Sequence, residues 1–209
     1  MSTTLSPLVG NNSSQPLASS NSPGHTLLFY EDDSALLEGL SESICTAICS
    51  GNSAIVVATA AHHNGLVAFL RARCAEAHTA IIEGRLFLLD AEETLSRIMV
   101  KGQLDPDLCI SVMGNYIAML AAAARGEGAK VFAYGELVSV LWERGNQTAA
   151  LHLELLCRQL AEHSPLLQLC CGYPLRLFPS DTGPTPIVRI ETRRTRVLLS
   201  KDLALADRS

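Results

Sequence analysis

The sequence predicts an α/β protein with a mainly parallel sheet of about five or more strands and helices on both faces. Short apolar runs, often rich in β-branched residues, alternate with longer segments whose apolar residues recur every three or four positions. The short runs are apolar throughout, which is typical of strands that are covered on both faces. Strands and helices that alternate in this way form parallel sheets. With 48% hydrophobic residues in 209, the chain has enough apolar material for one large core.

Five segments have the composition of buried strands. Each is short and ends near glycine or polar residues, and they lie at about 26–30, 54–58, 86–90, 130–135 and 166–171.

Helices are expected between these strands. The first begins at Asp32 or Asp33, because either carboxylate can accept hydrogen bonds from the free N–H groups of the first turn, and it ends at Gly51. The others are expected at about 61–77, 92–100 and 106–124, then through Trp142, and from the break at Gly145-Asn146 to about His163.

The chain divides into three parts by composition. Residues 1–24 carry no charged side chain and are rich in Ser, Asn, Pro and Gly, so they are predicted to be a disordered tail. Residues 25–174 form the predicted domain. Residues 175–209 form a C-terminal extension, in which the arginine-rich segment 187–199 is either an edge hairpin or a tail that binds a partner.

Charge and cysteine usage set limits on location and partners. The net charge of -5 argues against a protein that binds nucleic acid directly. Seven cysteines lie on apolar faces rather than at the spacings of a disulfide framework, and no secretory signal is visible, so we expect a cytoplasmic protein with reduced thiols.

One charge-free stretch, residues 108–124, falls short of the roughly 20 residues that a membrane span needs. Ile110, Met113, Ile117 and Leu120 recur within it at helical spacing. This spacing predicts a buried amphipathic helix rather than a segment in a membrane.

The motifs of ordinary nucleotide-binding and catalytic sites do not occur. There is no G-x-x-x-x-G-K-[ST] loop and no G-x-G-x-x-G turn to bring backbone N–H groups close to phosphate oxygens. Neither G-x-S-x-G nor H-E-x-x-H is present. We therefore expect no enzymatic activity, no cofactor and no metal, and we expect that ATP is neither bound nor hydrolysed.

Polar and aromatic side chains follow the predicted strands at their carboxyl ends. In open α/β sheets ligands bind outside this edge. The candidate binding residues there are Tyr30, Glu31, His62, Asp90, Tyr134 and Glu136. An acidic crevice with aromatic rims suits a cation, an amine or a polar organic molecule better than a phosphate. The alternative is that the acids only cap the helices that follow.

Two neighbouring pairs offer possible metal ligands. His62 and His63 point in different directions on a helix, so one of them is expected to line the crevice and they are poor joint ligands. Cys45 and Cys49 lie one helical turn apart and could contribute to a metal site. No second pair near them in the sequence completes four ligands, so free thiols are the expected reading.

Several runs, in this order and spacing, resemble the MEDS domain, the sensory domain of methanogens, methylotrophs and the dichloromethane-responsive repressor. The resemblance covers about residues 25–174. The matching runs are His25 to Asp33, Ala58 to His62, Gly84 to Leu95, Tyr134 to Val138 with Leu141-Trp142, Gly145-Asn146 with Leu153-Glu154, and Cys170 to Pro174.

The resemblance implies a degenerate relative of RecA/KaiC-type ATPases that lacks the phosphate loop and senses small organic molecules. Two positions depart from the family pattern. Ala61 replaces a glutamate in the family's T-x-E-H run, and Tyr134 replaces the usual phenylalanine before Gly-Glu.

We therefore expect a non-enzymatic sensory module that binds a small organic ligand and signals through a protein partner, a kinase or a transcription regulator. A homodimer is also expected, through apolar surface at Leu137, Val138, Leu141 and Trp142 and along the charge-free helix. The alternatives are a protein-interaction domain with an empty crevice and a residual nucleotide-binding protein that uses Asp90 and Glu136 for a metal.

Overall fold

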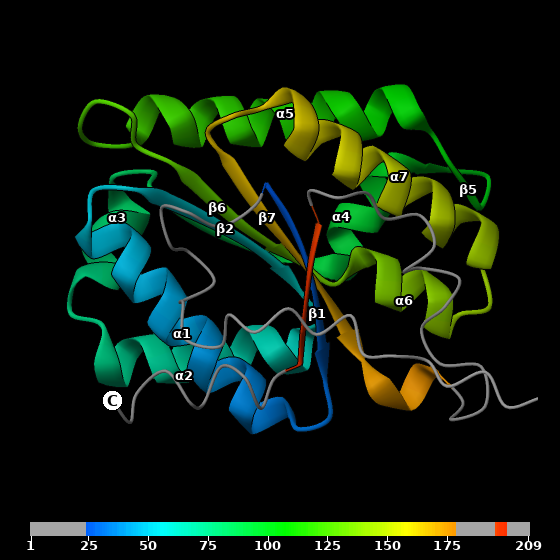
Figure 1. Cartoon of the computed structure of the whole chain (residues 1–209), viewed down its shortest axis with the longest axis horizontal. Coiled ribbons are helices and arrows are strands. Elements are labelled where there is room, and N and C mark those ends of the chain that lie inside the picture. The colour runs from blue at the N-terminus through cyan, green and yellow to red at the C-terminus, as the bar shows by residue number, and fades with distance from the viewer. Residues whose placement is uncertain (1–23, 179–194, 200–209) are drawn as a thin grey trace, which may run out of the picture.

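A computed structural model describes residues 24–178 and 195–199, and it contains a parallel sheet between two layers of helices (Figure 1). The sheet has six strands in the order β3-β2-β6-β7-β1-β8, and every neighbouring pair is parallel. The strands are β1 (His25–Tyr30), β2 (Ser53–Ala58), β3 (Leu86–Asp90), β6 (Val131–Gly135), β7 (Leu167–Pro174) and β8 (Thr195–Leu199). The predicted α/β class is confirmed, and the arrangement is consistent with a Rossmann-like or RecA-like fold.

Seven α-helices surround the sheet in the part of the chain that the structure describes. They are α1 (Asp33–Cys49), α2 (Ala60–Arg73), α3 (Glu76–Ile82), α4 (Ala91–Ile98), α5 (Pro106–Ala123), α6 (Leu137–Glu143) and α7 (Gln147–His163). One core cluster joins the sheet to α1, α2 and α3, and the other joins it to α4, α5, α6 and α7. The helices therefore cover both faces, as predicted.

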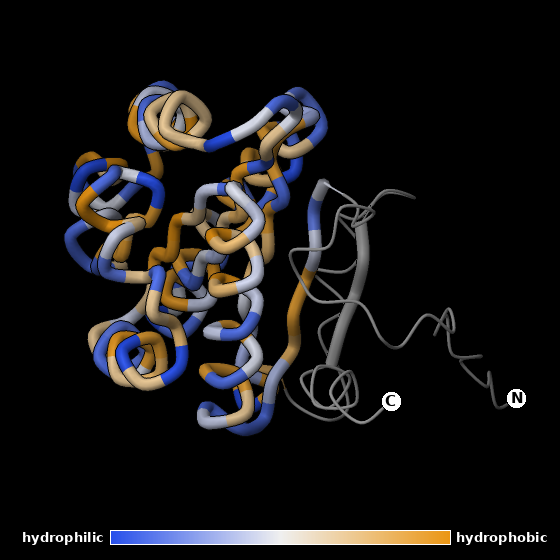
Figure 2. Tube along the Cα trace, turned by 90° about the vertical axis from the view of Figure 1, so that its left-hand side faces the viewer, coloured by the Kyte–Doolittle hydropathy of each residue, from blue (hydrophilic) through white to orange (hydrophobic). Residues whose placement is uncertain are grey.

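The apolar strands follow from this layering. Side chains alternate between the two faces of a strand, so Leu28 and Tyr30 pack in the first cluster while Leu27 and Phe29 pack in the second. All six residues of β1 and of β2 are buried. Figure 2 shows the strands between the helical layers as mainly hydrophobic.

Two of the expected helices differ in extent. The helix expected over 61–77 is divided into α2 and α3, because Cys74 is extended (φ -127°, ψ 92°) and caps α2. The helix expected over 92–100 ends at Ile98, where a hairpin of β4 (Met99–Val100) and β5 (Gln103–Leu104) begins. Its two turn residues, Lys101 and Gly102, both have positive φ, as tight hairpin turns require.

The last two strands extend the prediction. β7 continues to Pro174 because Tyr173 and Pro174 pair with the end of β1, and the 3₁₀ turn Leu175–Leu177 follows. Residues 195–199 of the arginine-rich segment form β8, a parallel edge strand beside β1. The predicted tail over 1–23 and the remainder of the extension, residues 179–194 and 200–209, lie outside the described residues.

Helix α5 is not the buried helix that its apolar spacing predicts. Cys109 and Leu120 are its buried residues, whereas the side chains of Ile110 and Met119 are 46% and 57% exposed. Val112, Met113, Tyr116, Ile117 and Ala121 pack against the second core cluster but stay partly exposed, so the apolar residues of the helix extend beyond its buried face. By length and composition alone α5 would suffice to cross a membrane, which is weak evidence by itself.

Candidate functional site

Glu136 is a buried carboxylate at the carboxyl edge of the sheet. It follows β6 directly, its side chain is 1% exposed, and its own N–H donates to the carbonyl of Val57 in β2. Oε2 accepts a hydrogen bond from the Thr59 N–H at 2.9 Å, and Oε1 accepts from the Tyr134 hydroxyl at 2.9 Å. The end of β6 is thereby joined to the beginning of α2.

His62 completes this arrangement from the first turn of α2. Its Nδ1 lies 2.5 Å from Oε1 of Glu136, and its Nε2 lies 3.4 Å from Oδ1 of Asp33 at the beginning of α1. The Tyr30 ring packs edge-on against the imidazole, with 5.9 Å between centroids. His62 is 12% exposed and Asp33 is 69% exposed, so the histidine lies between an inner and an outer carboxylate. We call Tyr30, Asp33, His62, Tyr134 and Glu136 the edge cluster.

The electrostatics of the edge cluster favour a charged histidine beside neutral tyrosines. The hydrogen bond to Glu136 raises the pKa of His62, burial opposes this, and the charges of Glu136 and Asp33 raise the pKa further. Burial, followed by the negative charge of Glu136, raises the pKa of both Tyr30 and Tyr134 well above the usual value. The imidazolium can therefore donate to both carboxylates, while the tyrosine hydroxyls remain donors.

Four of the six candidate binding residues lie together in the edge cluster: Tyr30, His62, Tyr134 and Glu136. Glu31 is exposed at the end of β1. Asp33, considered in the sequence only as a helix cap, is the residue that approaches His62. The capping position belongs to Asp32, whose carboxylate accepts from the Ala35 N–H at 2.6 Å.

Asp90 lies at the same edge but makes the contacts of a helix cap. It pairs with Ala58 across the β2–β3 register, and its carboxylate accepts from the Glu93 N–H at 2.9 Å. Its backbone carbonyl accepts from the Thr94 hydroxyl at 2.7 Å. The described contacts of Asp90 therefore belong to the beginning of α4.

Gly172 in β7 makes room for the Tyr134 hydroxyl, and the sequence analysis missed this role. A Cβ atom at this glycine would lie 2.1 Å from the hydroxyl oxygen. A glycine inside a strand is a sign that another group approaches closely. Gly172 is therefore what allows a tyrosine to reach Glu136 at this level of the sheet.

The apolar residues after Glu136 do not form a surface. Leu137, Val138 and Leu141 are buried in the second core cluster, and Trp142 packs against it, half-buried. The expected dimer contact at these four residues is therefore wrong, because α6 uses them to attach itself to its own domain.

The neighbouring histidine belongs to a different cavity. As expected, His62 and His63 diverge, and His63 lines a mainly apolar cavity of about 650 Å³ between β3 and helices α2 and α3. His78, Ile81 and Leu88 also line it. His63 thus offers a matched control for changes at His62.

A second buried polar group joins α7 to the sheet. His25 Nε2 lies 3.3 Å from Oε1 of Glu154 and 3.4 Å from Sγ of Cys171, and the Tyr173 hydroxyl donates to Glu154. Burial, followed by the charge of Arg158, lowers the pKa of His25 to about 4. These residues hold β1, β7 and α7 together in the interior.

Comparison with known proteins identifies the family. The model of the MEDS family, described as the methanogen/methylotroph, DcmR sensory domain, matches residues 24–183. No curated protein matches the chain. The match spans five of the six strands of the sheet, all but β8, together with the edge cluster. The chain therefore belongs to the MEDS family of sensory domains and is, at this level, a sensory module.

Proposed function

We propose that this domain is a non-enzymatic sensor that binds a small organic ligand at the edge cluster and signals through a protein partner, a kinase or a transcription regulator. One observation carries the proposal: at the carboxyl edge of the sheet, the buried carboxylate of Glu136 holds Tyr134, the beginning of α2 and His62, whose side chain is 12% exposed. Polar groups that converge beside apolar surface are typical of small-molecule sites.

The ligand class follows from the charges. Glu136 and Asp33 contribute two carboxylates, and His62, which is a cation when protonated, lies between them. An organic amine or another cation with small apolar substituents can replace the imidazolium beside Glu136, with the Tyr30 ring against its apolar part. An anion would meet two carboxylates instead.

Signalling requires that the ligand prefers one of two conformations. Glu136 accepts from Thr59 and contacts His62, so it connects the beginning of α6 with the beginning of α2. A ligand that displaces His62 removes one of these links and favours a different placement of α2. The partner then distinguishes the two placements of α2. The ligand can shift the equilibrium between these placements only as far as its affinities for them differ.

Thermal unfolding with a panel of small amines tests the proposal. We expect methylamine, trimethylamine or tetramethylammonium to raise the Tm saturably, while neutral alcohols of similar size leave it unchanged. A ligand at about 100 times its Kd stabilises the folded state by about 2.7 kcal/mol. Glu136→Gln should abolish the response. His62→Gln should retain or strengthen it, because the imidazole that competes for Glu136 is gone, and the matched control His63→Gln should respond like the wild type.

Two results would contradict the proposal. A response that is equal in the wild type and in Glu136→Gln would place the ligand elsewhere. Isothermal titration with Mg-ATP that gave a micromolar constant would favour a residual nucleotide-binding protein instead.

A further inference from the structure

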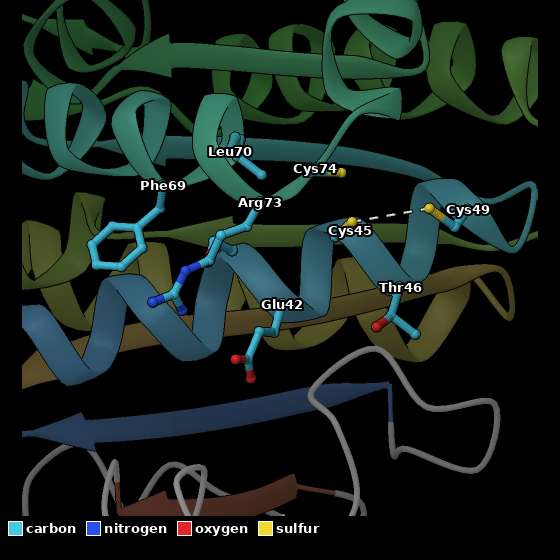
Figure 3. Close-up of a pocket in the computed structure, with 9 residues that line it drawn as sticks. Glu42, Cys45, Thr46, Cys49, Phe69, Leu70, Arg73 and Cys74 are labelled. Carbon is cyan, nitrogen blue, oxygen red and sulfur yellow. Dashed lines mark hydrogen bonds between the residues drawn. The ribbon is translucent and has the colours of Figure 1, made fainter. Parts of the chain in front are cut away.

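Three cysteine side chains meet between α1 and the end of α2, away from the edge cluster. Cys45 and Cys49 lie one turn apart on α1, and Cys74 caps α2. The three Sγ atoms all lie within 4.8 Å of one another, and those of Cys45 and Cys49 are 3.9 Å apart (Figure 3). We call these residues the thiol cluster. Cys74 is far from the other two in the sequence, so only the fold reveals it.

The thiol cluster opens into a cavity of about 340 Å³. Cys74 is buried, Cys45 is half-buried and Cys49 is exposed, so an ion can enter from solvent past Cys49. Figure 3 shows Glu42 and Thr46 extending away from the sulfur atoms. Arg73, on the same cavity, has its guanidinium over the Phe69 ring and pairs with Glu38. The cluster thus offers three ligand atoms and one open side.

The sulfur separations suit a metal better than a disulfide. A Zn–S bond of about 2.3 Å separates the sulfurs of a trigonal or tetrahedral set by roughly 3.8–4.0 Å. The Cys45 and Cys49 sulfurs already have this separation. A disulfide instead requires about 2.05 Å between sulfurs.

We propose that Cys45, Cys49 and Cys74 bind one thiophilic divalent metal ion of the Zn²⁺ class through three thiolates, with the fourth coordination position open to the cavity. As each metal–sulfur bond forms, one thiol loses its proton to solvent, so three protons leave for each ion bound. The complex carries one net negative charge. This site is separate from the proposed ligand site, and neither depends on the other.

Cys45 and Cys49 hold their protons before the metal arrives. Burial, followed by the neighbouring Cys74 thiol, raises the pKa of Cys45 to about 11, and burial, followed by the Cys45 thiol, raises the pKa of Cys49. Binding must displace these protons, so affinity should rise by up to roughly tenfold per pH unit for each thiol that ionises.

Titration of the reduced protein with Co²⁺, under exclusion of oxygen, tests the proposal. We expect one Co²⁺ per chain, a thiolate-to-cobalt charge-transfer band, and the intense visible bands of four-coordinate cobalt. Zn²⁺ should displace the Co²⁺, because soft thiolate ligands select Zn²⁺. Cys49→Ser and Cys45→Ser should each weaken binding by roughly tenfold or more, because each removes one of three ligands.

Two control variants make the test specific. Cys157→Ser removes a half-buried thiol of α7 and should bind Co²⁺ like the wild type. Glu136→Gln should also retain binding, so failure of the ligand proposal and failure of this one are distinguishable. Circular dichroism of each variant checks that the fold is retained.

Three results would overturn the proposal. The first is the absence of a charge-transfer band in the wild type. The second is a Cys49→Ser variant that binds as tightly as the wild type, which would place the metal at another group such as His25, Glu154 and Cys171. The third is a mass lower by two hydrogens in protein kept reduced, which would identify a disulfide instead.

Discussion

Nδ1 of His62 lies 2.5 Å from Oε1 of Glu136, although the two residues are 74 positions apart in the sequence. The contact exists because β2 and β6 are parallel neighbours whose carboxyl ends share one edge. His62 lies in the first turn of the helix after β2, and Glu136 caps the helix after β6. The sheet order thus brings an imidazole and a buried carboxylate together from the first turns of two helices.

Glu136→Gln should lower the pKa of His62, because it removes the partner that raises it most. The raised folded-state pKa means that His62 stabilises the fold fully below its unfolded pKa of about 6.5 and loses this contribution as the pH rises through the folded value. The variant should therefore lose more stability relative to the wild type at pH 6 than at pH 8. NMR titration of the His62 ring measures the pKa, and urea unfolding at both pH values measures the stability difference.

A matched variant is the control for this titration. His63 lies on the other cavity, so His63→Gln should leave the pKa of His62 unchanged. A His62 pKa that does not change in Glu136→Gln would show that the carboxylate does not govern the imidazole.

Tyr134→Phe should reduce the free energy of unfolding by about 1 kcal/mol, the usual net value of a buried hydrogen bond. The loss is moderate because Glu136 keeps its bonds to Thr59 and His62. Urea unfolding measures it, and Tyr116→Phe on α5, whose hydroxyl accepts from Arg97 at an exposed position, is the matched control. A variant as stable as the wild type would mean that the hydroxyl contributes nothing to the edge cluster.

Asp90→Ala should reduce the free energy of unfolding by about 1 kcal/mol through loss of the α4 cap. Asp90→Ser, which preserves a capping oxygen, should recover most of the loss. Neither variant should alter the thermal response to amines. If Asp90→Ala removes that response, Asp90 belongs to the ligand site as well as to the helix.

Light scattering should show a homodimer that uses α5. The exposed apolar side chains of Leu108, Ile110 and Met119 lie on this helix. The double variant Ile110→Lys with Met119→Lys should be monomeric, because two charges replace apolar contacts between copies. Ile82→Lys on α3, which is 73% exposed, is the control and should leave the dimer intact. A wild type that is monomeric at high micromolar concentration contradicts the prediction.

Gly172→Ala should destabilise the protein more than Tyr134→Phe does. The added methyl group would lie 2.1 Å from the Tyr134 hydroxyl and 2.7 Å from Cζ of the same ring, so the ring must move as a whole. Overpacking of this kind typically costs about 1–3 kcal/mol. Urea unfolding, together with the His62 pKa in the variant, tests whether displacing the ring also disturbs Glu136.

The fold could be predicted from the sequence because strands that are buried on both faces are apolar throughout. The five predicted strands match β1, β2, β3, β6 and β7 in place. The division at Cys74 could not be predicted, since the Ala and His residues around it continue a helical composition through the point where the backbone is extended. For α5, apolar spacing indicated a helix but could not show how little of its surface the other described residues cover.

At the site, a position at or just beyond the carboxyl end of a strand identified Tyr30, His62, Tyr134 and Glu136, since parallel strands bring such residues to one edge. The same rule could not separate Asp90, which caps α4, from Glu136, whose side chain turns inward. It also could not tell which of Asp32 and Asp33 caps α1 and which approaches His62, because that depends on where the His62 imidazole lies in the fold. Cys74 belongs to the thiol cluster because α1 packs against the end of α2, and the spacing of cysteines in the sequence does not predict that contact.

Gly172 and Tyr134 approach so closely that the side-chain volumes at these two positions depend on each other. The Tyr134 ring on β6 leaves no room for a side chain at position 172 on β7. Neither residue can therefore be replaced alone by a larger one. Shortening residue 134 creates the space that a methyl group at 172 needs. The double variant Tyr134→Leu with Gly172→Ala should therefore cost less than the sum of its single changes, and the excess measures steric coupling across the two strands.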